Sequence, residues 1–252
     1  MTGFPYLLED DPRPRLGLIV LRADETIEDD FRRCFPPEQV RLHISRVPSG
    51  QTLTPQSIHA MQEALPAAAY LLPRSVAFDV VGYACTSGTN LIGAKQVQTL
   101  IQSACSTALV TDPLSATFAA IRTLGLARIG IVSPYTAAIA QDLRAAFERA
   151  GIEVPSAVTF GEEIEANVAR IAPTSLISAA HEVVRAAKID GVFLSCTNLR
   201  TFGVIDGLEA ELGLPVLSSN QVLAWHMAQQ AKMGQMNSGV GRLMTGWDSD
   251  NT

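Results

Sequence analysis

Short apolar runs alternate with longer amphipathic stretches along nearly the whole chain. The apolar runs have the length of buried β-strands and cover residues 16–21, 40–47, 76–83, 107–111, 129–133, 154–160, 191–194 and 215–218. The stretches between them carry apolar residues at helical spacing and cover residues 55–72, 115–124, 137–150, 175–187 and 220–232. This alternation predicts parallel sheets covered by helices on both faces, so the expected fold class is α/β.

The second half of the chain repeats the first. The run LGLIV at 16–20 corresponds to IGIVS at 129–133, and the segment around Cys85 corresponds to the segment around Cys196, by nearly the same shift in numbering. We therefore expect two pseudo-symmetric lobes, each a parallel sheet flanked by helices. The expected first lobe is 15–111 plus a C-terminal helix at 219–244, the second lobe is 112–218, and the flexible termini are 1–14 and 245–252. Because ligands bind beyond the carboxyl ends of parallel strands, the site is expected in the cleft between the lobes.

Each half contains a cysteine at the exit of an apolar, strand-like run. Cys85 lies in GYACTSGTN and Cys196 in VFLSCTNLRT. A cysteine within a strand is usually a packing residue, whereas one at a strand exit, beside N–H groups and hydroxyls, lies where thiols become reactive. The matched settings of Cys85 and Cys196 predict two catalytic thiols, one on each side of a small molecule. Cys34 and Cys105 lack this setting, and we interpret both as structural.

Small polar residues follow both cysteines directly. Thr86 and Ser87 follow the first cysteine, and Thr197 and Asn198 follow the second. Their N–H groups and hydroxyls can lower the pKa of a thiol or hold a substrate carboxylate, so these four are candidate substrate-binding residues. One thiolate can remove a proton from carbon, or attack it, while the opposite thiol delivers a proton to the other face. Neither step needs a metal or an organic cofactor.

Composition and charge disfavour several other classes of protein. The chain has 252 residues and a formal net charge of −6, whereas nucleic-acid binding needs clustered lysine and arginine. No apolar run has the length of a membrane span, and we expect no signal peptide at the N-terminus. The four histidines are isolated, and no metal-site spacing or glycine-rich phosphate loop is present. The four cysteines are widely spread, which is typical of a reducing compartment, so we expect a cytoplasmic protein.

These segments resemble the aspartate/glutamate racemase superfamily and, within it, the maleate isomerase and arylmalonate decarboxylase branch. The resemblance covers residues 15–244 and rests on the two cysteine segments, IVSPY at 131–135, EIEANVA at 163–169 and GVGRL at 239–243. It implies a two-lobe α/β fold, cofactor-independent chemistry on a small carboxylate or amino-acid-like substrate, and a homo-oligomer. A tyrosine matching Tyr135 and an asparagine matching Asn167 help to hold the substrate carboxylates in maleate isomerases.

The resemblance leaves several reactions open. In maleate isomerases, one cysteine attacks the double bond, the C–C bond rotates, and the adduct collapses to fumarate. Racemases use the same pair of thiols as two opposed acids and bases. Arylmalonate decarboxylases keep only the second cysteine, so the presence of Cys85 counts against decarboxylation. A further alternative is a non-catalytic protein that binds small acids in the same cleft.

One position departs from the maleate isomerase pattern. Those enzymes follow the first strand with a PSSNT-type loop whose asparagine binds a carboxylate, and this chain has LRADE, with Asp24 at the asparagine position. A carboxylate repels a dianion such as maleate and favours a substrate with an ammonium or amide donor. Arg22 could offset Asp24, which keeps maleate open. The chain also resembles the ectoine-utilisation branch, where the substrate would be a diaminobutyrate derivative. The leading hypothesis is therefore a two-cysteine racemase or isomerase of a small amino-carboxylate.

Overall fold

The two halves of the chain form separate sheets with the same strand order. The computed structural model describes residues 3–50, 52, 54–75, 77–234 and 240–245. The first sheet contains β1 (Arg15–Leu21), β2 (Arg41–Val47), β3 (Val80–Ala84) and β4 (Val110–Thr111), in the order β2-β1-β3-β4. The second contains β5 (Arg128–Ser133), β6 (Glu153–Thr159), β7 (Gly191–Leu194) and β8 (Val216–Ser218), in the order β6-β5-β7-β8. The pairings within both sheets are parallel, which confirms the predicted fold class.

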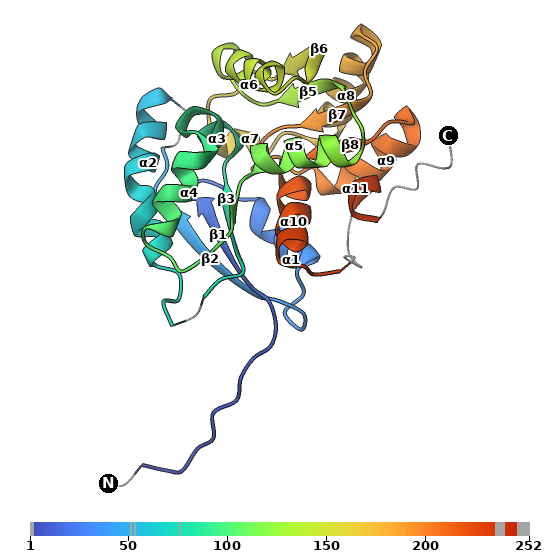
Figure 1. Cartoon of the computed structure of the whole chain (residues 1–252). Helices are drawn as coiled ribbons and strands as arrows, with labels where there is room; N and C mark the ends of the chain where they lie inside the picture. Colours follow the sequence, from blue (N-terminus) through green and yellow to red (C-terminus); the bar gives the residue numbers. More distant parts are fainter. Residues whose placement is uncertain (1–2, 51, 53, 76, 235–239, 246–252) are drawn as a thin grey trace.

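Helices flank both sheets (Figure 1). Those from the first half are α1 (Ile27–Cys34), α2 (Pro55–Tyr70), α3 (Thr86–Ile92), α4 (Ala94–Gln102) and α5 (Pro113–Thr123). Those from the second half are α6 (Ala137–Arg149), α7 (Glu165–Val168), α8 (Pro173–Ala186), α9 (Phe202–Leu212), α10 (Ser219–Gln230) and α11 (Gly241–Thr245). Of the helices in the described ranges, none is both long enough and apolar enough to cross a membrane.

The central strands are apolar because both of their faces are covered. β1 pairs with β2 on one side and β3 on the other, so that Leu18 lies opposite Ile44 and Gly82. Every residue of β3, and all but the first residue of β1, is buried. In the second sheet, Ile131 lies opposite Ala157 and Phe193 in the equivalent arrangement. The continuous apolar runs of the sequence are therefore strands buried on both faces.

Several elements differ from the sequence prediction at their boundaries, among them β4 and α5. The run 107–111 forms a strand only at Val110–Thr111, which is the edge of the first sheet. The helix predicted at 115–124 begins two residues earlier, as α5. It starts there because the Asp112 carboxylate accepts a hydrogen bond from the Ser115 N–H at 2.8 Å and caps the helix, and because proline is well suited to its first position.

The C-terminal part of the chain returns to the first sheet. α10 packs against β3 and α5, and it lies between the two sheets in Figure 1. It ends at Gln230, and α11 begins at Gly241, so two helices occupy the region predicted as one helix at 219–244. Residues 235–239 of this region, and 1–2 and 246–252 of the predicted flexible termini, lie outside the described residues.

The first turn of α10 is polar and completely buried. The Ser218 hydroxyl accepts a hydrogen bond from the Gln221 N–H at 3.3 Å, and the Gln221 side chain accepts one from the Ser218 N–H at 3.2 Å. This capping box fixes the start of the helix. Ser219 and Asn220 have no exposed surface, and buried polar side chains need hydrogen-bond partners. The partners of both residues include atoms in the segment that follows β7.

Candidate active site

The two predicted cysteines lie at equivalent ends of the two sheets, and their segments meet. Cys85 directly follows β3, and Cys196 follows β7 after one intervening residue. Both are buried and neither forms a disulfide. The Thr197 hydroxyl donates a hydrogen bond to the carbonyl oxygen of Ala84 at 3.4 Å, which joins the second cysteine segment to the residue before Cys85. The two thiols therefore belong to one site, where the carboxyl ends of the two sheets face each other.

Ser219 links the two cysteine segments. Its hydroxyl oxygen accepts a hydrogen bond from the Cys196 N–H at 3.0 Å and lies 2.9 Å from the Thr86 hydroxyl, where either oxygen can be the donor. Sequence reasoning missed this residue, because nothing in the hydrophobic pattern shows that α10 begins against both segments. The available signal was a serine immediately after the last predicted strand.

Cys196 has a backbone conformation that residues with side chains rarely adopt. Its φ angle is 129°, in a region that costs about 1–3 kcal/mol for such a residue. The conformation is held by the bond to Ser219 and by the following turn, in which the Leu199 N–H donates to the Cys196 carbonyl oxygen at 3.4 Å. Strained backbone of this kind concentrates at functional sites, which supports a reactive role for Cys196.

Cys85 is the N-cap of α3, and its thiol lies against the first turn of that helix. The sulfur accepts a hydrogen bond from the Gly88 N–H at 3.2 Å and lies 3.8 Å from the Ser87 hydroxyl. Burial raises the pKa of Cys85 to about 11, although these two donors lower it. A Cβ at Gly88 would lie 2.8 Å from both the Cys85 sulfur and the Tyr83 hydroxyl oxygen, so only glycine fits this close approach.

Burial also raises the pKa of Cys196 well above its ordinary value. The Glu165 carboxylate raises this pKa further, whereas the Asn198 backbone N–H lowers it, and the charges of Asp24 and Cys85 add smaller increases. The hydrogen-bond donors predicted after each cysteine are present, but burial has the larger effect on the pKa of both thiols. Both thiols of the free protein therefore carry their protons at neutral pH, and one proton must leave before a thiolate can react.

These raised pKa values predict how the reactivity of Cys85 depends on pH. Since its pKa is about 11, the thiolate fraction should increase about tenfold per pH unit throughout the range from pH 7 to 10. We expect the rate of Cys85 alkylation by iodoacetamide, followed by peptide mass spectrometry, to increase in proportion and to reach no plateau in that range. A plateau below pH 9 would show that the N-terminus of α3, and not burial, has the larger effect on the pKa of Cys85.

Two buried tyrosines accompany the thiols. The Tyr135 hydroxyl accepts a hydrogen bond from the Ser195 hydroxyl at 3.4 Å, and burial, followed by the charge of Cys196, raises the pKa of Tyr135. Burial, followed by the charge of Cys85, raises the pKa of Tyr83 in the same way. The Tyr83 hydroxyl has no hydrogen-bond partner among the described residues. Tyr83 was missed by sequence reasoning, because a tyrosine inside an apolar strand is usually a core residue.

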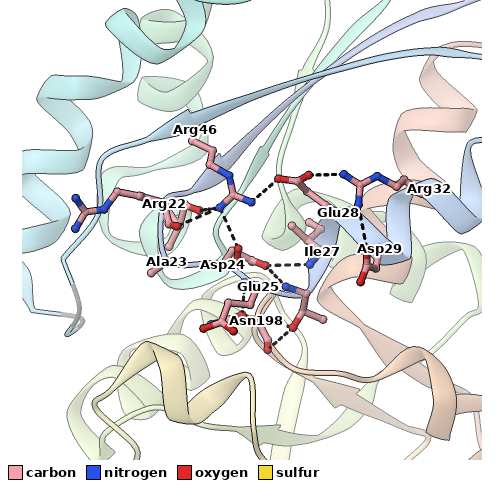
Figure 2. A network of polar contacts seen from close by, with 12 residues as sticks. Arg22, Ala23, Asp24, Glu25, Ile27, Glu28, Asp29, Arg32, Arg46 and Asn198 are labelled. Atoms are coloured by element: carbon pink, nitrogen blue, oxygen red, sulfur yellow. Dashed lines mark hydrogen bonds and ion pairs between the residues drawn. The ribbon is translucent and has the colours of Figure 1, made fainter.

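Asn198 connects the loop after β1 to α7. Its Oδ1 accepts a hydrogen bond from the Glu25 N–H at 2.9 Å, as Figure 2 shows, and its Nδ2 donates to the Glu165 carbonyl oxygen at 2.9 Å and to Glu165 Oε2 at 3.2 Å. The Thr26 hydroxyl donates to the Asn198 carbonyl oxygen at 3.0 Å. Both ends of the amide that we predicted to bind substrate are thus used by the protein, and they hold the site together.

Asp24 is buried next to this connection. Its Oδ1 accepts hydrogen bonds from the N–H groups of Thr26 at 2.8 Å and Ile27 at 2.9 Å, which fixes the start of α1. Burial raises the pKa of Asp24, while the two N–H groups and the Thr197 hydroxyl lower it. The effect of Thr197 shows that the carboxyl group lies against the segment that contains Cys196. The structure thus brings Asp24 to the site, as predicted from its position after the first strand.

Arg22 does not neutralise Asp24. Arg22 is exposed, and its guanidinium points away from the Asp24 carboxylate (Figure 2). The cation whose charge lowers the pKa of Asp24 is Arg46, after the larger effects of burial and hydrogen bonding. Arg46 donates to the backbone carbonyl oxygen of Asp24 at 3.0 Å and forms an ion pair with Glu28, so it does not bind the Asp24 carboxylate directly.

The short helix α7 presents Glu165 to the site, whereas Asn167 is exposed. Asn167 Nδ2 donates to Glu162 Oε2 at 3.3 Å. Glu165 is buried, and burial raises its pKa, with a partial decrease from Asn198 and a further increase from the charge of Asp24. Sequence reasoning missed Glu165, because the two faces of a four-residue helix cannot be assigned from periodicity. The substrate contact predicted for Asn167 stays a prediction.

Most of the predicted site residues come together in the structure. The connected set contains Cys85, Cys196, Asp24, Thr86, Ser87, Tyr135, Thr197 and Asn198. Tyr83, Glu165 and Ser219 join them without having been predicted. Within the described ranges, no three His, Cys, Asp or Glu side chains are grouped so that they could hold a metal ion. The arrangement offers two thiols for acid–base or nucleophilic chemistry, with hydroxyls and buried carboxyls around them.

Comparison with known proteins identifies relatives along the whole length of the chain. A family model described as arylmalonate decarboxylase matches residues 16–244. A maleate isomerase from Nocardia farcinica is 24% identical over 244 residues, which cover 91% of this chain and 95% of the relative. An arylmalonate decarboxylase from Bordetella bronchiseptica is 26% identical over 237 residues, which cover 91% of this chain and 96% of the relative.

Solved structures share the same two-lobe fold. A maleate cis-trans isomerase from Nocardia farcinica, a cysteine-to-serine mutant with a covalently bound succinylcysteine intermediate, superposes with a TM-score of 0.81 at 21% identity, covering 93% of this chain and 99% of its own. A double mutant of arylmalonate decarboxylase in a liganded form, with one glycine changed to cysteine and one cysteine to serine, also has a TM-score of 0.81, at 26% identity, covering 92% and 98%.

Proposed function

The chain belongs to the arylmalonate decarboxylase family, and from this premise we propose that it is a cofactor-independent isomerase or racemase of a small carboxylate. The observation that carries the proposal is the meeting of two buried thiols, Cys85 and Cys196, whose segments are joined through Ser219. Two thiols at one site supply the acid and the base that inversion at carbon requires. They equally supply a nucleophile for reversible addition to a double bond.

Racemisation is the first candidate reaction. One cysteine thiolate removes the α-proton of the substrate, and the electron pair of the broken C–H bond stays on the substrate as a carbanion or enolate. The opposite thiol then donates its proton to the other face of the same carbon. One thiolate and one thiol remain afterwards, with their positions exchanged. We assign the substrate carboxylate to hydroxyls around the thiols, namely those of Thr86, Ser87, Tyr135 and Thr197.

Maleate cis–trans isomerisation is the second candidate, and the names of several relatives favour it. A thiolate adds to one carbon of the double bond, and the π electron pair moves to the neighbouring carbon and its carboxylate. The C–C bond rotates, the C–S bond breaks, and its electron pair returns to the sulfur as the trans double bond forms. The substrate neither gains nor loses an atom over these steps.

Asp24 favours the first candidate with an amino-carboxylate substrate, because a buried carboxyl group disfavours a nearby dianion. In keeping with the resemblance to the ectoine-utilisation branch, we propose diaminobutyrate derivatives as the leading substrates. Decarboxylation of an arylmalonate is supported by the family model, but Cys85 counts against it. The four cysteines form no disulfide in the described part of the chain, which supports the proposal of a cytoplasmic protein. A homo-oligomer is proposed from the resemblance alone.

The test is proton NMR of the enzyme in D₂O with aspartate, glutamate, free and acetylated 2,4-diaminobutyrate, maleate and phenylmalonate. Loss of an α-proton signal through exchange with deuterium is expected and would support racemase chemistry. Appearance of fumarate would support maleate isomerisation, and loss of carbon dioxide from phenylmalonate would support decarboxylation. Unchanged spectra for all six compounds would contradict the proposed activity and favour a protein that only binds small acids.

A further inference from the structure

Asp24 has one buried carboxylate oxygen that no described residue satisfies. Only 3% of the residue is exposed. Oδ1 accepts hydrogen bonds from two backbone N–H groups, whereas Oδ2 accepts none among the described residues. The Thr197 hydroxyl lies near enough to lower the pKa of Asp24, but it donates to the Ala84 carbonyl oxygen. A buried acceptor without a donor is costly, and native structures rarely keep one without a reason. This oxygen therefore points to a donor that is supplied from outside the chain.

Glu165 provides a second buried carboxyl group beside the first. Asn198 holds the two residues next to each other, because its Nδ2 donates to Glu165 Oε2 at 3.2 Å while its Oδ1 accepts the N–H of Glu25, the residue after Asp24. The charge of Asp24 raises the pKa of Glu165, after the larger effect of burial. Both carboxylates also raise the pKa of Cys196, so both lie close to a reactive thiol.

The charged groups around this pair leave its negative charge uncompensated. Arg46 from β2 faces Asp24, but its Nη1 donates to the backbone carbonyl oxygens of Leu21, Arg22 and Asp24, and its Nη2 pairs with Glu28 (Figure 2). Asp30 of α1 adds another carboxyl group nearby. Burial raises its pKa to about 6, Asn220 and the charge of Arg33 lower it, and the charge of Asp24 adds a smaller increase. In the described part of the chain, no ion pair joins Asp24 or Glu165 to a cation.

We propose that Asp24 and Glu165 together bind the ammonium group of the substrate, which makes the enzyme selective for amino-carboxylates over dicarboxylates. The inference rests on the proposed function, since it places the ammonium group next to the carbon on which Cys196 acts. An ammonium group has three N–H donors and one positive charge, which match an unpartnered carboxylate oxygen and a neighbouring carboxyl group. Asp24 alone would be only the cap of α1, because its Oδ1 accepts the first N–H groups of that helix. The neighbouring carboxyl group of Glu165 is what indicates a binding site for a cation.

Ligand binding to this pair has a consequence that can be measured. Burial raises the pKa of both carboxyl groups, so the free pair holds protons to a higher pH than ordinary carboxyl groups do. The positive charge of a bound ammonium group favours the ionised form of both groups. A proton that the pair holds is then released: the O–H bond of the carboxylic acid breaks, its electron pair stays on the carboxylate, and the proton passes to the buffer.

The first test compares kcat/KM for the ammonium-bearing compounds of the NMR panel with kcat/KM for maleate. Wild-type enzyme should turn over the ammonium-bearing compounds, and Asp24→Asn and Glu165→Gln should each lower kcat/KM for them about 10- to 100-fold, mainly through KM. Asp24→Asn should also increase kcat/KM for maleate. Glu163→Gln, an exposed neighbour of Glu165, is the matched control and should resemble wild type.

The second test measures binding directly and separates this inference from the proposed function. Calorimetry with 2,4-diaminobutyrate and with succinate, in phosphate and in Tris, should show tighter binding of the diamine and a heat difference that reports proton release. Both effects should be lost in Glu165→Gln, whose side chain has nearly the same size as glutamate. This variant tests the subsite even if Asp24→Asn fails to fold.

Each unfavourable outcome has a distinct meaning. A preference of the wild-type enzyme for maleate would overturn the ammonium subsite and leave the proposed function standing. Absence of turnover with every compound, together with selective binding of the diamine, would overturn the proposed function and support the subsite. Binding of succinate as tight as that of the diamine, or no binding of either, would overturn the subsite.

Discussion

Replacing Cys196 with serine is expected to lower the turnover of the substrate by at least about 1000-fold. A serine hydroxyl has almost the same size as a thiol but is far less acidic, so it cannot supply the thiolate that either candidate reaction needs. The strained backbone at position 196 and its bond to Ser219 should tolerate the substitution, because both involve main-chain atoms of Cys196. Steady-state kinetics measures the loss, and circular dichroism checks that the variant is folded.

Cys85→Ser should cause a loss of the same order, since both reactions proposed here use the pair. In a racemase, each single variant should still exchange the α-proton of one enantiomer with D₂O, because the remaining thiol still reaches one face of the carbon. Cys105→Ser is the matched control, since Cys105 is partly exposed and lies outside the site, and it should retain wild-type activity. Full activity of Cys85→Ser would contradict the two-thiol mechanism and favour decarboxylation through Cys196 alone.

The fold could be predicted from the hydrophobic pattern because the strands that fix it are buried on both faces. β1, β3, β5 and β7 form the centres of the two sheets, and each gives a continuous apolar run. The edge strand β4 was predicted too long, since Ala108 and Leu109 before it are exposed and only Val110 and Thr111 pair with β3. The similar order of strands in the two sheets follows from the internal repeat, which the sequence shows at two independent places.

The site could be predicted only where chemistry follows a strand end directly. Cys85, Cys196 and Asp24 all lie just beyond strands, so their approximate location follows from the topology of parallel sheets. Ser219 also follows a strand directly, but its place in the site, like that of Glu165, depends on how α10 and α7 pack against the other lobe, which the hydrophobic pattern does not show. The pKa of each thiol depends on the same packing, and for this reason the expected lowering by nearby donors became an increase on burial.

Asn198→Ala is expected to destabilise the protein by about 2–4 kcal/mol and to reduce activity strongly. The substitution removes the acceptor of the Glu25 N–H and the donor to the Glu165 carboxyl and carbonyl groups. Removing one partner of a buried hydrogen bond costs about 1–3 kcal/mol, and here two sets of partners are lost. The pKa of Glu165 should rise further, because Asn198 lowers it in the wild type. Urea denaturation at pH 7 measures the loss of stability.

Asn167→Ala is the informative control for this prediction, since Asn167 is an exposed asparagine on the short helix that Asn198 contacts. Its one side-chain hydrogen bond, to Glu162, is exposed, so the free energy of unfolding should change by no more than about 0.5 kcal/mol. If Asn167 contacts the substrate, as the family resemblance implies, KM should rise in this variant while stability stays constant. Equal stability of the two variants would show that Asn198 does not connect the lobes. A selective loss in Asn198→Ala would instead establish that this amide is structural, and that the ligand must be held by the hydroxyls and the two carboxyl groups around the thiols.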